Sequence, residues 1–450
     1  MRIPEAPPRS PEKGTPVSVA HQDRAERLTE DEIFRAHRGG KLRTQVPITP
    51  LDARALSAIS TPGVAHVSRA IAEDGRLAAD YTWAHRLVAV VSDGTAVLGL
   101  GDVGPAAALP VMEGKAALFK ALGGLDSVPL VLNTRDVDEI VETLVRLRPS
   151  FGAINLEDVA APRCFELERA LDAALDCPVM HNDQHGTAIV ALAALRSSAD
   201  LLGKPLPSMR VVVSGAGAAG TACARMLVAA GAGEVIVLDS RGVIHHGRPE
   251  LSTAKAQLAE LTNPRGLRGG LADVLPGADV FIGVSSATVP EELIAAMAPG
   301  AVVFALSNPT PEIAPDVAAR YAAVVATGRS DHPNQISNLL ACPGIFRGAL
   351  DAGATRITER MMLAAADAIV ALAAEDLAPD RVVPSVLDPR VAPGVAAAVA
   401  AAVREPGAAR EPFSTGTPLA AGAPLSGGAQ LAAGAPLAAV PSSVSVEERP

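Results

Sequence analysis

Three carboxylates follow short apolar runs and could together hold a metal ion. Glu157 and Asp158 close the run "AINL", and Asp183 lies in "CPVMHNDQHGTAIVALAAL", where an apolar run meets a helical pattern. If both runs are strands of one parallel sheet, the three oxygen ligands converge at neighbouring strand ends. Hard carboxylates with positions left for water and substrate suit Mg²⁺ or Mn²⁺ better than Zn²⁺. The alternative is that the acidic pair caps a helix N-terminus.

Lys115 is a candidate general base. It follows the glycine-rich, nearly uncharged stretch "VSDGTAVLGLGDVGP" and lies just inside an apolar helical pattern. Partial burial there would lower the pKa of the lysine and let it accept a proton. A lysine that extends along the surface to reach water is the alternative.

A glycine-rich turn predicts a dinucleotide site. The pattern G-x-G-x-x-G occupies residues 215–220 (Gly215, Ala216, Gly217, Ala218, Ala219 and Gly220). It follows a predicted strand, opens a predicted helix and precedes Asp239, the acidic end of the next strand, by roughly 20 residues. The helix N-terminus would hold the pyrophosphate. Asp239 would accept ribose hydroxyls and repel a 2′-phosphate, which favours NAD over NADP, although Arg241 keeps NADP open.

Elements that position these residues alternate in type. Short β-branched runs such as "ADVFIGVSS", "AVVFALSNPT" and "AAVVATGRS" end at small polar residues, and helical patterns such as "PEELIAAM" lie between some of them. This alternation predicts an α/β fold with a doubly wound parallel sheet from about residue 31 to 400. Residues 1–30 are predicted to be a disordered leader, and residues 401–450, where "LAAGAPL" occurs twice, a disordered Ala/Pro/Gly-rich tail.

Composition excludes several classes of protein. The 450-residue chain has 39 Lys and Arg against 49 Asp and Glu, a formal net charge of -10 that argues against nucleic-acid binding. No uninterrupted apolar run approaches the about 20 residues of a membrane span, and the Pro-rich N-terminus lacks the apolar core of a secretion signal. We therefore expect a cytoplasmic protein without membrane contact, whose four dispersed cysteines are reduced thiols.

Together these stretches resemble the malic enzyme family, most closely its short bacterial form. The matching segments run in family order from about residue 37 to 370 and include "HRGGKL", "TPGVA", "PVMEGKAALFK", "NLEDVAAPRCFE", "HNDQHGTAIV", "SGAGAAG", "SNPTPEI" and "GRSDHPNQ". The resemblance implies oxidative decarboxylation of (S)-malate to pyruvate and CO₂, with NAD or NADP and Mn²⁺ or Mg²⁺. It also implies a homo-oligomer, a dimer or a tetramer, in which residues 31–180 form the N-terminal catalytic domain and residues 181–400 the Rossmann-type NAD(P)-binding domain.

The resemblance also assigns roles to single residues. Glu157, Asp158 and Asp183 correspond to the metal ligands, and Lys115 to the base that removes the C2 hydroxyl proton. Asn308 in "SNPT" and Asn338 in "NQISN" correspond to the amides that hold malate or the cofactor.

Three positions depart from the family pattern. Ser60 stands where the family has the tyrosine that donates the final proton, Asn182 replaces an aspartate beside a metal ligand, and Ser337 replaces an asparagine. We therefore predict weakened decarboxylating turnover. Two alternatives follow: a catalytically silent sensor that binds NAD and metal, or an oxidoreductase for a related 2-hydroxy acid.

Overall fold

The computed structural model describes residues 28–48 and 51–404. The described chain begins with four short helices, α1 (Glu30–His37), α2 (Ala53–Ile59), α3 (Val64–Glu73) and α4 (Ala78–Tyr81). Helix α1 begins at a capping box formed by Thr29 and Glu32, and the side chain of Asp52 caps α2. None of these four helices buries a residue within the chain.

The first sheet has four parallel strands in the order β2-β1-β3-β4. Its strands are β1 (Leu87–Ser92), β2 (Asp126–Val131), β3 (Ala153–Leu156) and β4 (Val179–His181). Helices α5 (Pro105–Gly123), α6 (Val137–Leu147) and α7 (Arg163–Ala174) connect them in turn, as parallel pairing requires. Strands β1 and β3 are buried along their whole length, so they are continuous apolar runs with little alternation.

Helix α8 (Asn182–Leu202) leads from the first sheet to the second. Most of its residues are buried, and they lie on all faces of the helix, because α8 packs against α9 (Ala218–Ala229) and α15 (Glu359–Ala373). A helix that is covered all round can be apolar all round, which explains the Ala/Ile/Val/Leu run of residues 188–195.

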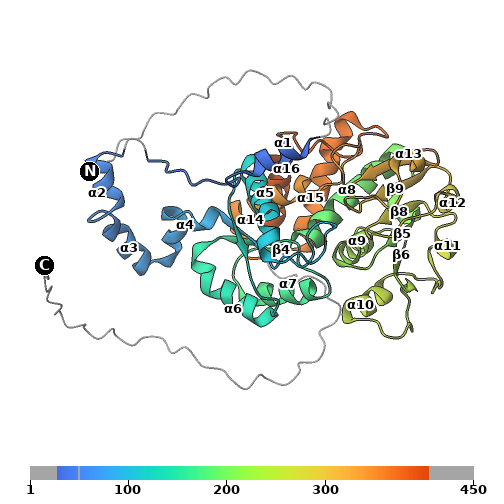
Figure 1. Ribbon diagram of the computed structural model, residues 1–450, viewed down its shortest axis with the longest axis horizontal. Helices are drawn as coiled ribbons and strands as arrows, with labels where there is room; N and C mark the ends of the chain where they lie inside the picture. The colour runs from blue at the N-terminus through green and yellow to red at the C-terminus, as the bar shows by residue number, and fades with distance from the viewer. Residues whose placement is uncertain (1–27, 49–50, 405–450) are drawn as a thin grey trace. The chain divides into compact units, whose positions relative to one another are not determined.

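The second sheet has six strands in the order β10-β9-β8-β5-β6-β7, and every pair is parallel except the short β7. Its strands are β5 (Arg210–Ser214), β6 (Glu234–Asp239), β7 (Gly242–Val243), β8 (Val280–Gly283), β9 (Ala301–Ala305) and β10 (Ala322–Thr327). Helices α9, α10 (Thr253–Leu261), α11 (Leu271–Val274), α12 (Glu291–Ala295) and α13 (Pro315–Ala318) lie around this sheet (Figure 1). The strand order reverses at β5, where open α/β sheets bind their ligands.

Three C-terminal helices complete the core: α14 (Cys342–Asp351), α15 and α16 (Val391–Arg404). They contact one another, and α15 lies against α8 (Figure 1). Helices α14 and α16 approach closely because of two glycines: a Cβ at Gly344 would lie 2.6 Å from the Cβ of Val395, and one at Gly348 would lie 2.4 Å from the carbonyl oxygen of Ala396.

The α/β prediction with a parallel doubly wound sheet is confirmed. The predicted leader and tail lie almost entirely outside the described residues, and α16 continues to Arg404, so it includes the first four residues of the predicted tail. Among the described helices, none has the length and hydropathy of a membrane span. All four cysteines are free and buried, as expected for reduced thiols.

Candidate metal and dinucleotide site

Strand register brings the three predicted carboxylates together. Leu156 of β3 pairs with His181 of β4, so the chain segments that follow both strands leave the sheet side by side. The amide N–H of Asp158 donates to Oδ2 of Asp183 at 2.8 Å. One carboxylate oxygen from each of Glu157, Asp158 and Asp183 lies within 4.8 Å of the other two. The predicted convergence at neighbouring strand ends therefore occurs.

Asp158 is a buried carboxylate with a strongly raised pKa. Burial, followed by the charges of Asp183 and Glu157, raises its pKa to about 8. Its Oδ2 atom is buried and has no hydrogen-bond partner, and its backbone adopts a left-handed φ of 55°. A buried carboxylate oxygen without a donor, beside two other carboxylates, is the environment that a hard divalent cation stabilises. The donor set fits Mg²⁺ or Mn²⁺.

Glu157 is held by three donors. Its Oε2 atom accepts from the side-chain amides of Asn155 at 2.8 Å and Asn182 at 2.9 Å, and its Oε1 atom lies 3.0 Å from Nζ of Lys115. From the sequence, Asn182 looked like a missing carboxylate. In the structure it is a neutral donor that orients Glu157, a role that an ionised aspartate could not fill. The other signal for this arrangement was Asn155, a polar residue within a buried strand.

Lys115 lies at the predicted site with a pKa opposite to the predicted one. Its Nζ donates to Oδ1 of Asn338 at 3.1 Å and forms an ion pair with Glu157, with only 10% of its side chain exposed. Burial lowers the pKa of Lys115, but the charge and hydrogen bond of Glu157 and the charge of Asp183 outweigh it, so the pKa lies above its ordinary value. The expected lowering was wrong for the metal-free site, because the expectation considered burial and omitted the neighbouring carboxylates.

The polar cluster at the start of α8 divides between two carboxylates. Nε2 of His181 lies 3.3 Å from Oδ2 of Asp183. On the other side, Glu168 of α7 accepts from the amide N–H of His181 at 2.6 Å and from Nε2 of Gln184 at 2.9 Å, and lies 3.0 Å from Nε2 of His185. Glu168 therefore fixes the first turn of the helix that carries Asp183, a role that its place in the sequence did not reveal.

The glycine turn follows β5 at the point where the sheet order reverses. Gly215 has a φ of 125°, and a Cβ there would lie 2.7 Å from the carbonyl oxygen of Val284. A Cβ at Gly220 would lie 1.9 Å from the carbonyl oxygen of Gly215, whereas one at Gly217 would meet open space. Gly215 and Gly220 thus permit close packing, and Gly217 leaves room for a phosphate at the N-terminus of α9.

The remaining predicted residues lie in different surroundings. Asn338 contacts Lys115 and is the first residue of a short 3₁₀-helix, Asn338–Leu340. Ser337 caps this helix, because its hydroxyl oxygen accepts from the N–H of Leu339 at 3.4 Å. Asn308 is exposed on the loop after β9, where its carbonyl oxygen lies against Gly99. Ser60 is exposed at the end of α2, and its backbone bonds stay within that segment.

Glu312 is a buried carboxylate that the sequence prediction did not include. It accepts from the backbone N–H of Ser285, after β8, at 2.9 Å and from that of Ser307, after β9, at 3.2 Å. A Cβ at Gly283 would lie within 2.5 Å of it. Glu312 therefore ties together the two loops that border the carboxyl ends of β8 and β9, including the loop that carries Asn308.

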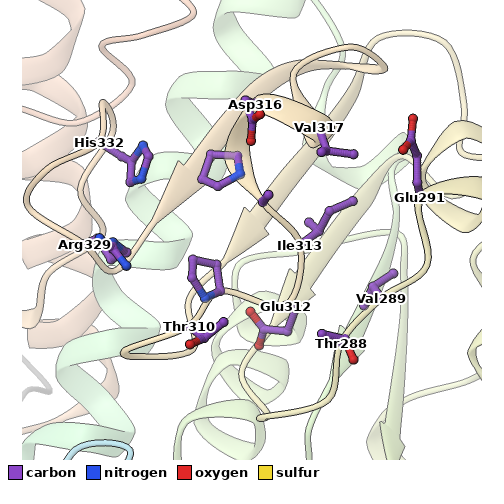
Figure 2. A pocket seen from close by; sticks show the side chains of 13 residues that line it. Thr288, Val289, Glu291, Thr310, Glu312, Ile313, Asp316, Val317, Arg329 and His332 are labelled. Carbon is purple, nitrogen blue, oxygen red and sulfur yellow. The ribbon is translucent and has the colours of Figure 1, made fainter.

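Glu312 also borders a cavity of about 590 Å³ (Figure 2). It is lined by residues 288, 289, 291, 310–317, 329 and 332, with Arg329 and His332 at one side and Thr288 and Glu291 at the other. None of the three clustered carboxylates borders it. The carboxylates with Lys115 suit a cation, and the glycine turn suits a phosphate. Both are therefore better candidates for the functional site than this cavity.

Comparison with known proteins shows which families and structures this chain is similar to. The model of the malic enzyme N-terminal domain matches residues 39–172, and that of the malic enzyme NAD-binding domain matches residues 184–406. The chain is 50% identical to the NAD-dependent malic enzyme of Geobacillus stearothermophilus over 84% of this chain and 80% of that protein. It is 51% identical to the bifunctional malic/malolactic enzyme of Bacillus subtilis over 82% and 91%. The crystal structure of the NAD-dependent malic enzyme from Thermotoga maritima superposes with a TM-score of 0.79, at 44% identity over 83% and 99% of the two chains.

Proposed function

Because the chain belongs to the malic enzyme family, we propose that it catalyses the oxidative decarboxylation of malate to pyruvate and CO₂ with NAD or NADP as hydride acceptor. The observation that carries the proposal is the cluster of Glu157, Asp158 and Asp183 beside the buried Lys115. The relatives named after this reaction use either NAD or NADP. Residues 31–180 and 181–400 are the proposed catalytic and NAD(P)-binding domains, supported by the two family-model matches.

The carboxylate cluster would hold Mn²⁺ or Mg²⁺. Bound there, the cation would polarise the C2 oxygen of malate and stabilise the enolate left by decarboxylation. The chain's part is to keep three carboxylate groups close together at the end of a buried sheet. Asn155 and Asn182 hold one oxygen of Glu157 in place, and Glu168 holds the helix that carries Asp183.

Lys115 would exchange the proton of the C2 hydroxyl. Its Nζ is held between Oε1 of Glu157 and Oδ1 of Asn338. Only the neutral amine has a lone pair that can accept the proton of the C2 hydroxyl. If Glu157 held a cation, its charge would attract the ammonium of Lys115 less, and burial would then favour the neutral lysine. Asn338 is a positioning residue for this lysine. The exposed Asn308 would contact the cofactor or malate from the loop after β9.

Ser60 and Asn182 bear on how fast the reaction runs. Ser60 corresponds to the family's proton-donor tyrosine, and a serine hydroxyl is too weak an acid to replace a phenol. The structure removes part of the concern about Asn182, because its amide donates to Glu157. We therefore expect Ser60 to contribute more than Asn182 to the predicted weakening of turnover. Ser60→Tyr should raise malate turnover by at least about tenfold, since general acid catalysis contributes about 10²–10⁴-fold.

The proposal is tested by initial rates with the purified full chain, Mn²⁺ and malate, with NAD and NADP assayed separately. Malate-dependent reduction of either cofactor that is lost in Asp183→Asn is the expected result. A silent sensor would bind nucleotide and Mn²⁺ without turnover, and Ser60→Tyr would not change this. An enzyme for another 2-hydroxy acid would reduce the cofactor faster with that acid than with malate.

Assembly and location complete the proposal. We expect a homo-oligomer, a dimer or a tetramer, supported by large apolar side chains that are exposed on or beside helices α2–α4 (Leu51, Leu56, Ile59, Val64, Tyr81 and Trp83). Light scattering on a sizing column measures the mass directly. A cytoplasmic location is supported by the four free thiols and by the NAD(P) chemistry.

A further inference from the structure

The carboxylate of Asp239, at the end of β6, is already fully engaged within the protein. Its Oδ1 atom accepts from Nη2 of Arg248 at 2.7 Å and from the backbone N–H of Arg241 at 2.9 Å. Its Oδ2 atom accepts from Nζ of Lys255 at 2.6 Å. Only 8% of the side chain is exposed. A ribose hydroxyl that donated to Asp239 would have to displace a charged donor.

The charge around Asp239 is positive. Two cations, Arg248 and Lys255, face this single carboxylate. Burial raises the pKa of Asp239, but the hydrogen bonds from Lys255, Arg248 and the Arg241 amide lower that pKa by more than burial raises it. The group is therefore ionised and counts as one negative charge. The side chain of Arg241 is also nearby in sequence, 66% exposed and paired with Glu250, which is 77% exposed. An exposed pair of this kind is worth little and is readily exchanged.

The two cations differ in their freedom. Arg248 is committed to the fold, because its Nη1 atom also donates to the carbonyl oxygens of Gly242 and Val243 at 3.0 and 3.3 Å. Lys255, on α10, has 31% of its side chain exposed and uses one of its three ammonium donors on Asp239. Lys255 therefore has donors left for a ligand that is rich in acceptors.

In dinucleotide folds, the end of the strand after the glycine turn lies beside the 2′-position of the adenosine ribose. Resting on the proposed function, we propose that the end of β6 binds the 2′-phosphate of NADP through Lys255 and Arg241, so that the chain accepts NADP at least as well as NAD. Asp239 then serves to orient Lys255 and does not exclude the phosphate. This reverses the preference for NAD drawn from the sequence, where Asp239 was taken as free.

Binding measurements on the full chain test this without turnover. Adenosine 2′,5′-bisphosphate and 5′-AMP differ only in the 2′-phosphate, and calorimetry gives a dissociation constant for each. We expect the bisphosphate to bind more tightly. Lys255→Gln should weaken the bisphosphate about tenfold, as expected for one charge-assisted contact, and should leave 5′-AMP within about twofold. Arg241→Gln, an exposed substitution, should weaken the bisphosphate alone by a smaller factor.

Arg265→Gln is the matched control. Arg265 pairs with Glu234 at the opposite end of the same strand, at 2.6 and 2.8 Å, so its loss should change neither constant. The inference is overturned if wild type binds 5′-AMP as tightly as the bisphosphate, or if folded Lys255→Gln and Arg241→Gln both bind the bisphosphate like wild type. Malate turnover with NAD but not NADP would also overturn it and leave the proposed function standing. Tight bisphosphate binding without any malate turnover would do the reverse.

Discussion

Lowering the pH from about 8 to about 6 should weaken Mn²⁺ binding to the carboxylate cluster by up to about a hundredfold. In the metal-free protein, burial and the charges of Asp183 and Glu157 raise the pKa of Asp158 from 3.8 to about 8. Below that pH the cation must displace one proton from Asp158 in order to bind. A one-proton linkage changes the dissociation constant about tenfold for each pH unit below the pKa, and little above it.

Calorimetric titration with Mn²⁺ at several pH values measures this dependence. Repeating each titration in buffers of different ionisation enthalpy counts the protons released: nearly one at about pH 6, falling toward zero above about pH 8. Asp158→Asn should bind Mn²⁺ more weakly and lose the proton release. A dissociation constant that stays flat between about pH 6 and 8 in wild type, with no proton release, would refute the account of Asp158 as the protonated ligand.

Three further substitutions test single contacts. Lys115→Ala should lower kcat for malate by about 10²–10⁴-fold, as loss of a general base does, with nucleotide binding unchanged. The control is Lys120→Ala, which changes an exposed lysine on the same helix. Equal effects of the two substitutions would count against Lys115 as the general base. Asn182→Asp removes a donor to Glu157 and adds a like charge, so denaturant unfolding of the metal-free protein should show a loss of about 1–3 kcal/mol; unchanged stability would contradict the donor role. Glu312→Gln places an amide NH₂ against backbone N–H donors, so the dissociation constant for the dinucleotide should rise several-fold, roughly 1 kcal/mol, whereas the exposed Glu292→Gln should have no effect.

Local sequence patterns were sufficient for the elements that carry the site. The run "AINL" became β3, the glycine turn opened α9 after β5, and Asp239 ended β6, because each pattern reflects a strand buried on both faces and a polar residue at its carboxyl end. The convergence of the carboxylates also followed, because adjacent parallel strands end at one edge of the sheet. These predictions needed only the neighbouring residues in the sequence, or the rule that adjacent parallel strands end at the same edge of a sheet.

The partners of these residues could not be predicted in the same way. The pKa of Lys115 depends on Glu157, and the availability of Asp239 at the end of β6 depends on Lys255 of helix α10. Asn182 differs from the family's aspartate by one atom type, and only the approach of Glu157 reveals it as a donor. Such contacts are set by tertiary packing, so charge and hydrogen-bond states were the part of the site that sequence reasoning left open or misjudged.

Malate should lose both a hydride and a carboxylate on this chain. Malate labelled in its C4 carboxyl group, incubated with the full chain, Mn²⁺ and either NAD or NADP, tests both losses in one sample. We expect labelled CO₂, pyruvate and reduced nicotinamide in equal amounts, with the Asp183→Asn protein producing none of them. Reduced nicotinamide without labelled CO₂, or no reaction in wild type and Ser60→Tyr alike, would contradict this expectation.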